Sequence, residues 1–159
     1  MANKYVVFKL ESEFYGIAIE RVERILPEPT LTKVPKAHPH LLGIFDLRGQ
    51  TLPAIDLRRK FGMADRDGTS TYVVVECPQG HVAVRVDAVD GIVEIDDATT
   101  DDSSTLFSGK MDPWVTAVAR DRDRLVVLLE PTEVATHAEF VEPEPEPVLA
   151  KPAKSKKIA

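Results

Sequence analysis

The tripeptide Asp-Leu-Arg occurs twice in this sequence, at residues 46–48 and again, ten residues later, at 56–58. These residue types support three kinds of chemistry. Two carboxylates can share the acid and base steps of a reaction. Two arginines can hold a phosphate between their planar guanidinium groups. Aspartate can also cap a turn or a helix, with no chemistry beyond local structure. The neighbours of each tripeptide indicate which of these applies.

The second tripeptide has the pattern of a helix start. Asp56 follows the apolar segment 51–55 and precedes a basic run, 58–60, with Gly62 behind it. An aspartate at this position accepts hydrogen bonds from the free amides of the first turn. Basic side chains suit the negative end of a turn, and glycine can adopt the left-handed conformation that closes it. We therefore expect Asp56 to be a cap and not a catalytic acid.

The first tripeptide has the pattern of a hairpin tip. Arg48 lies between two apolar segments, and Gly49 fits the third position of a tight turn, where a positive φ is needed. This places Arg48 in solvent, where it is either an idle surface charge or a recognition residue. We expect a carboxylate from Glu20, Glu23 or Asp46 to lie within salt-bridge reach of Arg48.

The remaining polar residues do not form the pattern of an active site or a metal site. The pair His38 and His40 has no cysteine or acid at ligand spacing, so a surface loop is the better interpretation. A cluster of acidic residues lies between residues 87 and 102. Gly91 is misplaced for a twelve-residue calcium loop in this segment, so we expect a solvated acidic face, or else a patch that steers partners. Nucleophile elbows, P-loops and dinucleotide-binding glycine patterns are absent from the sequence. We predict no enzyme, no metal and no cofactor. The acids of that face are Asp87, Asp90, Glu94, Asp96, Asp97, Asp101 and Asp102.

The elements that must position these residues are short and apolar, and they recur about every ten residues. They are rich in valine and isoleucine and are bounded by glycine, proline and aspartate, which is typical of a β-barrel or β-sandwich. A short helix is predicted over 22–26, where apolar residues share one helical face, and a second one over 131–140. The nine predicted strands are 5–10, 14–19, 41–47, 51–55, 71–76, 81–86, 91–95, 114–119 and 125–130.

Composition narrows the class of protein. The chain has 159 residues and a formal net charge of -6, which argues against nucleic-acid binding because that needs a basic face. The single cysteine, Cys77, cannot form an internal disulfide, and we expect a buried, inert thiol and a cytoplasmic setting. No apolar run reaches the roughly 20 residues of a membrane helix, so no direct membrane insertion is expected. Residues 141–159 are rich in proline, first acidic and then basic, and predict a disordered tail.

Three ordered motifs carry a resemblance to a known family. The stretch VPKAHPHLLGIFDLRGQTLPAIDLRRKFG (34–62) resembles the chemotaxis coupling protein family, the CheW-like domain. Upstream, YGIAIERVERIL (15–26) is similar to the family's Tyr-Gly-Ile segment, and downstream VAVRVDAVDGIVEI (82–95) is similar to its second motif. The resemblance covers about residues 4 to 135.

This resemblance implies a mainly β fold and a non-catalytic role. The implied fold is two side-by-side five-stranded SH3-like β-barrel subdomains with short helices, intertwined within residues 1–140, the second over roughly 70–125. The implied partners are the regulatory domain of a CheA-like histidine kinase and the cytoplasmic tip of a methyl-accepting chemoreceptor. The chain would be a monomer alone and would assemble with its partners in membrane-associated arrays. A fragment of a histidine kinase is disfavoured, because the chain begins at the first predicted strand.

The resemblance also implies a partner-binding site. Val22, Gly43 and Arg48 match positions that the family uses around its receptor-facing groove and its kinase contact, and Gly49 adjoins them. The family often has an acid where this chain has Arg24, while Glu23 lies one step away, about 100° round a helix. This departure leaves open a divergent scaffold, for instance of pilus-based motility. A structural or ligand-binding β-barrel is the remaining alternative.

Overall fold

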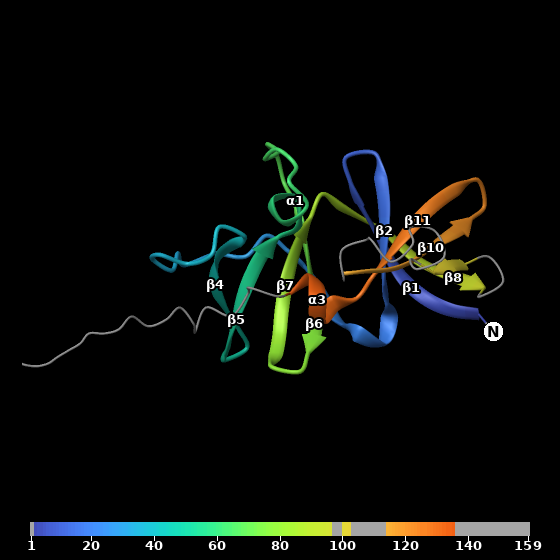
Figure 1. Ribbon diagram of the computed structural model, residues 1–159. Coiled ribbons are helices and arrows are strands. Elements are labelled where there is room, and N and C mark those ends of the chain that lie inside the picture. The colour runs from blue at the N-terminus through green and yellow to red at the C-terminus, as the bar shows by residue number, and fades with distance from the viewer. Residues whose placement is uncertain (1, 97–99, 103–113, 136–159) are drawn as a thin grey trace, which may run out of the picture.

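The chain folds into two β-sheets, as the computed structural model shows for residues 2–96, 100–102 and 114–135 (Figure 1). The first sheet contains β1 (Ala2–Leu10), β2 (Glu13–Ala18), β8 (Ala88–Asp96), β9 (Thr100–Asp102), β10 (Val115–Asp121) and β11 (Arg124–Leu129). The second contains β3 (Val22–Pro27), β4 (Leu41–Leu47), β5 (Gln50–Asp56), β6 (Thr71–Cys77) and β7 (Gly80–Val86). Each of the nine predicted strands corresponds to one of these strands.

The strand order explains how the two halves are joined. The first sheet runs β8-β1-β2-β11-β10-β9, so the N-terminal hairpin pairs with strands from the C-terminal half of the domain. The second runs β3-β6-β7-β5-β4 and is continuous in sequence. Most neighbours are antiparallel, but β2 pairs with β11 and β5 with β7 in parallel. The chain therefore passes between the sheets twice, at residues 18–22 and at residues 86–88.

The apolar residues form three clusters. Each sheet has one cluster of its own, and residues of both sheets build the third. Val7 and Val126 belong to a cluster built from the first sheet alone, and Leu52 and Tyr72 to one built from the second. In the largest cluster, Phe8 of β1 packs with residues of β6 and β7 from the other sheet. The prediction of a mainly β fold with two barrel-like halves side by side is thus confirmed, although one half has six strands.

The helix predicted over 22–26 is wrong, because these residues form the edge strand β3. A single 3-10 turn, Ile19–Arg21, precedes it, and from Arg24 onward half-buried and exposed residues alternate along the strand, as in a sheet. Three apolar residues within five positions fit both the helical period of 3.6 and the strand period of 2. Here the segment forms a strand because it pairs with the backbone of β6. Ile25, one of the apolar residues of that predicted helix, is 43% exposed.

Turns and short helices complete the domain. Pro78 lies in the two-residue turn between β6 and β7, and Arg122 lies in the turn between β10 and β11. Helix α3 spans Pro131–Val134. The rest of the predicted helix 131–140 and the whole tail 141–159 lie outside the described residues. None of the helices in the described part of the chain is long and apolar enough to span a membrane.

Candidate functional site

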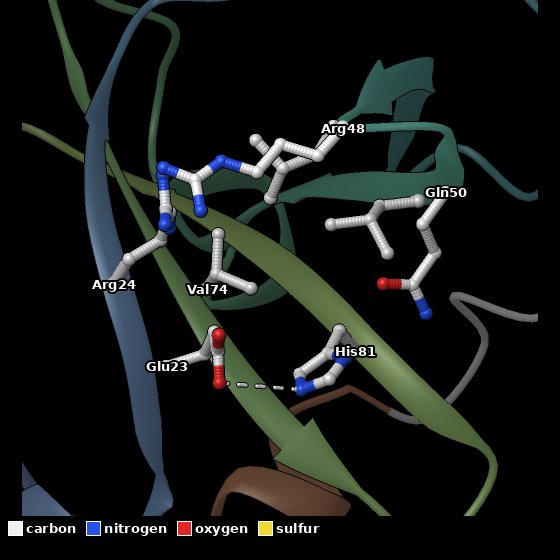
Figure 2. A pocket seen from close by; sticks show the side chains of 8 residues that line it. Glu23, Arg24, Arg48, Gln50, Val74 and His81 are labelled. Atoms are coloured by element: carbon white, nitrogen blue, oxygen red, sulfur yellow. Dashed lines mark ion pairs between the residues drawn. The ribbon is translucent and has the colours of Figure 1, made fainter.

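A small open groove of about 120 Å³ lies at one end of the second sheet. The β4–β5 and β6–β7 hairpins both turn at this end (Figure 1). Val74 lies among the polar side chains of the groove (Figure 2). Leu52 also lines the groove, and both apolar side chains are almost fully buried. The complete lining is Glu23, Arg24, Leu47, Arg48, Gln50, Leu52, Val74 and His81.

The hairpin tip holds Arg48 in a defined backbone conformation. Leu47 pairs with Gln50, which leaves Arg48 and Gly49 as a two-residue turn. Both turn residues have positive φ, 54° for Arg48 and 86° for Gly49, as the primed turns of tight hairpins require. The carboxylate of Asp46 accepts a hydrogen bond from the Gly49 amide at 3.3 Å and so caps the turn. Arg48 is exposed, so the predicted tip position of both residues is confirmed.

A β-bulge on the facing strand brings two successive side chains into the groove. The register between β3 and β6 shifts between Val22 and Arg24, so that Glu23 is the extra residue. A bulge interrupts the strict alternation of side chains across a strand. Glu23 and Arg24 consequently both line the groove, and the expected separation of about 100° round a helix does not occur. Val22 packs instead against the shared core.

The guanidinium groups of Arg24 and Arg48 point toward one another across the groove (Figure 2). The expected ion pair of Arg48 with a carboxylate is wrong: within the described ranges, neither Glu20, Glu23 nor Asp46 pairs with it. Asp46 is engaged by the turn, and the carboxylate of Glu23 faces His81. Two positive charges therefore share this end of the groove without a neutralising acid from the described part of the chain.

At the opposite end of the groove, His81 lies between two carboxylates. Its Nε2 is 3.7 Å from an oxygen of Glu23 and 3.7 Å from an oxygen of Glu76. These three side chains form a group of metal-ligand type among the described residues, which the sequence did not suggest because they come from three strands. Both carboxylates are exposed, 45% and 56% respectively, as acids on a solvated surface commonly are.

Gly43 has a structural task at some distance from the groove. Its φ is +155°, and a Cβ at this position would lie 2.5 Å from the carbonyl oxygen of Thr32. That carbonyl accepts a hydrogen bond from Ile44, and Thr32 donates one to Ile44 in return. Gly43 is buried and does not line the groove. Of the residues singled out from the sequence, the groove brings together Glu23, Arg24 and Arg48.

The second Asp-Leu-Arg tripeptide begins a short helix, as predicted. The carboxylate of Asp56 accepts a hydrogen bond from the Arg58 amide at 3.0 Å, and α1 (Leu57–Lys60) follows. Gly62 closes the turn with a φ of 77°. Asp56 is only 3% exposed, and this burial raises the pKa of its carboxyl group despite the nearby Arg85 and Arg59. The cap is therefore a part of the core as well as of the helix.

Arg58 has a role that the sequence did not indicate. Its guanidinium forms two hydrogen bonds of 2.7 Å with the carboxylate of Asp87 and one of 3.2 Å with Glu11. Asp87 lies between the two sheets and also accepts a bond from the Glu11 amide. These hydrogen bonds hold the pKa of the Asp87 carboxyl below its ordinary value. The expected solvated acidic face is thus wrong for Asp87, which ties the two halves together.

Cys77 is half-buried, near the packing of α3 on β6. Its Sγ lies 3.8 Å from the carbonyl oxygen of Pro131. Burial raises the pKa of this thiol, which keeps it protonated near neutral pH and poorly reactive. This agrees with the expected inert thiol, although burial is incomplete.

Known proteins resemble this chain along most of its length. The model of the CheW-like domain matches residues 4–139. A chemotaxis protein CheW of Helicobacter pylori is 28% identical over 133 residues, which are 82% of this chain and 80% of that protein. A probable chemotaxis protein CheW of Rhizobium etli is 26% identical over 130 residues, 80% of this chain and 84% of that protein.

A solved structure agrees with the fold as well. The scaffolding protein TtCheW of Thermoanaerobacter tengcongensis superimposes with a TM-score of 0.77 at 27% identity, covering 86% of this chain and 94% of that one. The family model alone spans far more than half of the sequence, and the two-sheet architecture fits it. The chain belongs to the CheW-like domain family.

Proposed function

We propose that this protein is a non-catalytic adaptor that couples methyl-accepting chemoreceptors to a chemotaxis-type histidine kinase. Family membership supports a scaffolding role, since relatives of this chain are named as chemotaxis proteins and one solved relative as a scaffolding protein. Coupling requires at least one surface that is rigid, exposed and specific. The protein would act in the cytoplasm, at receptor arrays on the membrane.

The observation that carries this proposal is the groove beside the Arg48 hairpin. Binding energy concentrates in residues that combine exposed charge or aromatic surface with a fixed geometry, and arginine is prominent among them. Arg48 has both properties, because its turn is fixed by left-handed backbone angles and by the Asp46 cap. Leu52 and Val74 line the groove as buried apolar residues beneath the polar side chains. We assign partner binding to this groove, with Gly49 needed to form the turn.

The experiment compares two hairpin tips of the same chain. Arg122 is an exposed arginine in a two-residue turn with a φ of 60°, and it matches Arg48 in type, exposure and backbone conformation. Arg48→Ala and Arg122→Ala should each change the free energy of unfolding by less than about 0.5 kcal/mol, as surface changes usually do. The first should weaken partner binding by about 1 to 2 kcal/mol, and the second should leave it unchanged.

Binding is measured by calorimetry with two partners from the same genome: the signalling tip of a chemoreceptor and the regulatory domain of the histidine kinase. The proposal predicts that both bind, and that Arg48→Ala weakens at least one of them. Equal affinity of the two alanine variants for both partners would contradict the assignment of the groove. A failure of both partners to bind the unmodified protein would contradict the coupling function itself.

A further inference from the structure

Arg24 and Arg48 form a pair of like charges that no acid of the described residues neutralises. Both guanidinium groups line the same groove of about 120 Å³ and point toward one another. Arg24 comes from the bulged strand β3 and Arg48 from the β4–β5 turn, so two separate elements bring them together. Neither has an ion-pair partner in the part of the chain that the structure describes.

The environment of Arg24 and Arg48 favours the binding of a negative charge. Two like charges repel one another, and apolar surface beside them increases the interaction because it lowers the local dielectric. Leu52 and Val74 provide such surface in this groove. A carboxylate can accept hydrogen bonds from two guanidinium groups at once, each through a planar pair of donors. One acidic side chain placed between the two arginines would therefore satisfy both.

We propose that the Arg24–Arg48 pair is a binding site for one aspartate or glutamate side chain of the partner protein. This inference rests on the proposed function and specifies the chemistry of the partner at the groove. The protein carries a net charge of -6, so its overall charge repels an acidic partner. A local pair of positive charges then fixes the orientation in which such a partner docks.

The decisive test is a comparison of two substitutions at Arg24 in the full-length chain. Arg24→Gln removes one donor group and should weaken partner binding about fivefold to tenfold. Arg24→Glu places a carboxylate beside Arg48, which then neutralises Arg48 internally and repels the acid of the partner. It should weaken binding by more than about 30-fold, because a like charge is placed opposite the partner's acid.

The matched control is Arg122→Glu, which makes the same change of charge at the other hairpin tip and should alter affinity within about twofold. Circular dichroism and urea unfolding verify that each variant is folded. A purely structural role of Arg24 predicts the reverse order, because Arg24→Glu would create an internal ion pair. Affinity of Arg24→Glu equal to or tighter than that of Arg24→Gln would overturn the proposal.

A second measurement keeps this inference separate from the coupling function. The probe is the peptide acetyl-Gly-Glu-Gly-amide, titrated while the arginine Nε–Hε signals are followed by NMR. The signals of Arg24 and Arg48 should shift together and that of Arg122 should not. Peptide shifts without binding of receptor or kinase would support the acid site and reject the coupling function. Kinase or receptor binding that is indifferent to Arg24→Glu would reject the acid site alone.

The alternative occupant is the chain's own acidic segment, with Glu142, Glu144 and Glu146. Full-length protein with all three changed to glutamine distinguishes the two sources of the carboxylate. The proposal predicts that the peptide shifts both arginine signals equally well with and without these changes. Shifts that appear only in the triple variant would overturn it, because the groove would then belong to the segment of the same chain.

Discussion

Removal of one partner from the contact between Arg58 and Asp87 should destabilise this domain strongly. The two side chains are 10% and 11% exposed and are joined by two hydrogen bonds of 2.7 Å. Asp87→Ala leaves the buried guanidinium with Glu11, itself 54% exposed, and with the carbonyl oxygen of Ala64. Removal of one partner from a buried pair costs about 3 to 5 kcal/mol. Since both groups keep slight access to water, we expect a loss of about 3 kcal/mol.

The assay is urea unfolding followed by fluorescence and circular dichroism at pH 7. Asp90→Ala is the matched control, because Asp90 also pairs with an arginine, Arg124, but is 39% exposed. Arg124 keeps a second partner, Asp121, so the control should lose less than about 1 kcal/mol. The reasoning would be refuted if Asp87→Ala were no more destabilising than Asp90→Ala.

A double variant separates the cost of an unpaired charge from the value of the pair. Arg58→Met combined with Asp87→Leu replaces both charges with apolar groups of similar length. Replacement of a whole buried pair is often close to neutral, so the double variant should recover much of the stability lost in Asp87→Ala. If the double variant instead loses the sum of the two single losses, the two side chains contribute independently and their contact adds no stability.

Three further predictions concern buried groups. Because the pKa of Asp87 is lowered in the fold, its stabilising effect is complete above the ordinary value of 3.8 and is lost as the pH falls through the lowered pKa. In Asp87→Ala, the free energy of unfolding measured in urea should therefore depend less on pH over that acidic range. The pKa of Asp56 is raised in the fold, so its contribution to the free energy of unfolding is present below the ordinary value of 3.8 and is lost as the pH rises through the raised pKa. Asp56→Asn should remove this pH-dependent loss and should lower the free energy of unfolding by at most about 1 kcal/mol at pH 7. Partner binding, measured by calorimetry, should be unchanged. Gly43→Ala should lose about 2 kcal/mol or more, because its Cβ would press on the Thr32 carbonyl; unfolding that matches the unmodified protein would show that the backbone adjusts freely.

The positions of the strands could be predicted because alternating apolar residues and turn residues act over a few positions. The hairpin at Arg48 and Gly49 and the cap at Asp56 are signals of the same short range, and both are found as expected. The helix predicted over 22–26 is wrong because its signal also extended over only a few positions. Five residues are too few to separate a period of 3.6 from a period of 2, and pairing with β6 decided the matter.

Contacts between distant segments could not be predicted from local patterns. Arg58 and Asp87 are separated by 29 positions and meet only because the link between the sheets passes beside α1. In the groove, Arg24 faces Arg48 and Glu23 faces His81 because of one β-bulge, which no short-range signal announced. The local pattern predicted the position of Arg48, and the family resemblance implied a partner-binding role for it, whereas its neighbours in the groove required the structure.

We propose that the protein couples a receptor to a kinase and that the groove beside Arg48 is needed for this coupling, and a reconstituted kinase assay tests this most directly. Receptor signalling fragments, the histidine kinase of the same genome and this protein are mixed on vesicles, and kinase autophosphorylation is measured. We predict that the unmodified protein and Arg122→Ala raise kinase activity in a receptor-dependent manner, and that Arg48→Ala does so much less at equal concentration. Equal activation by Arg48→Ala and Arg122→Ala would contradict the claim.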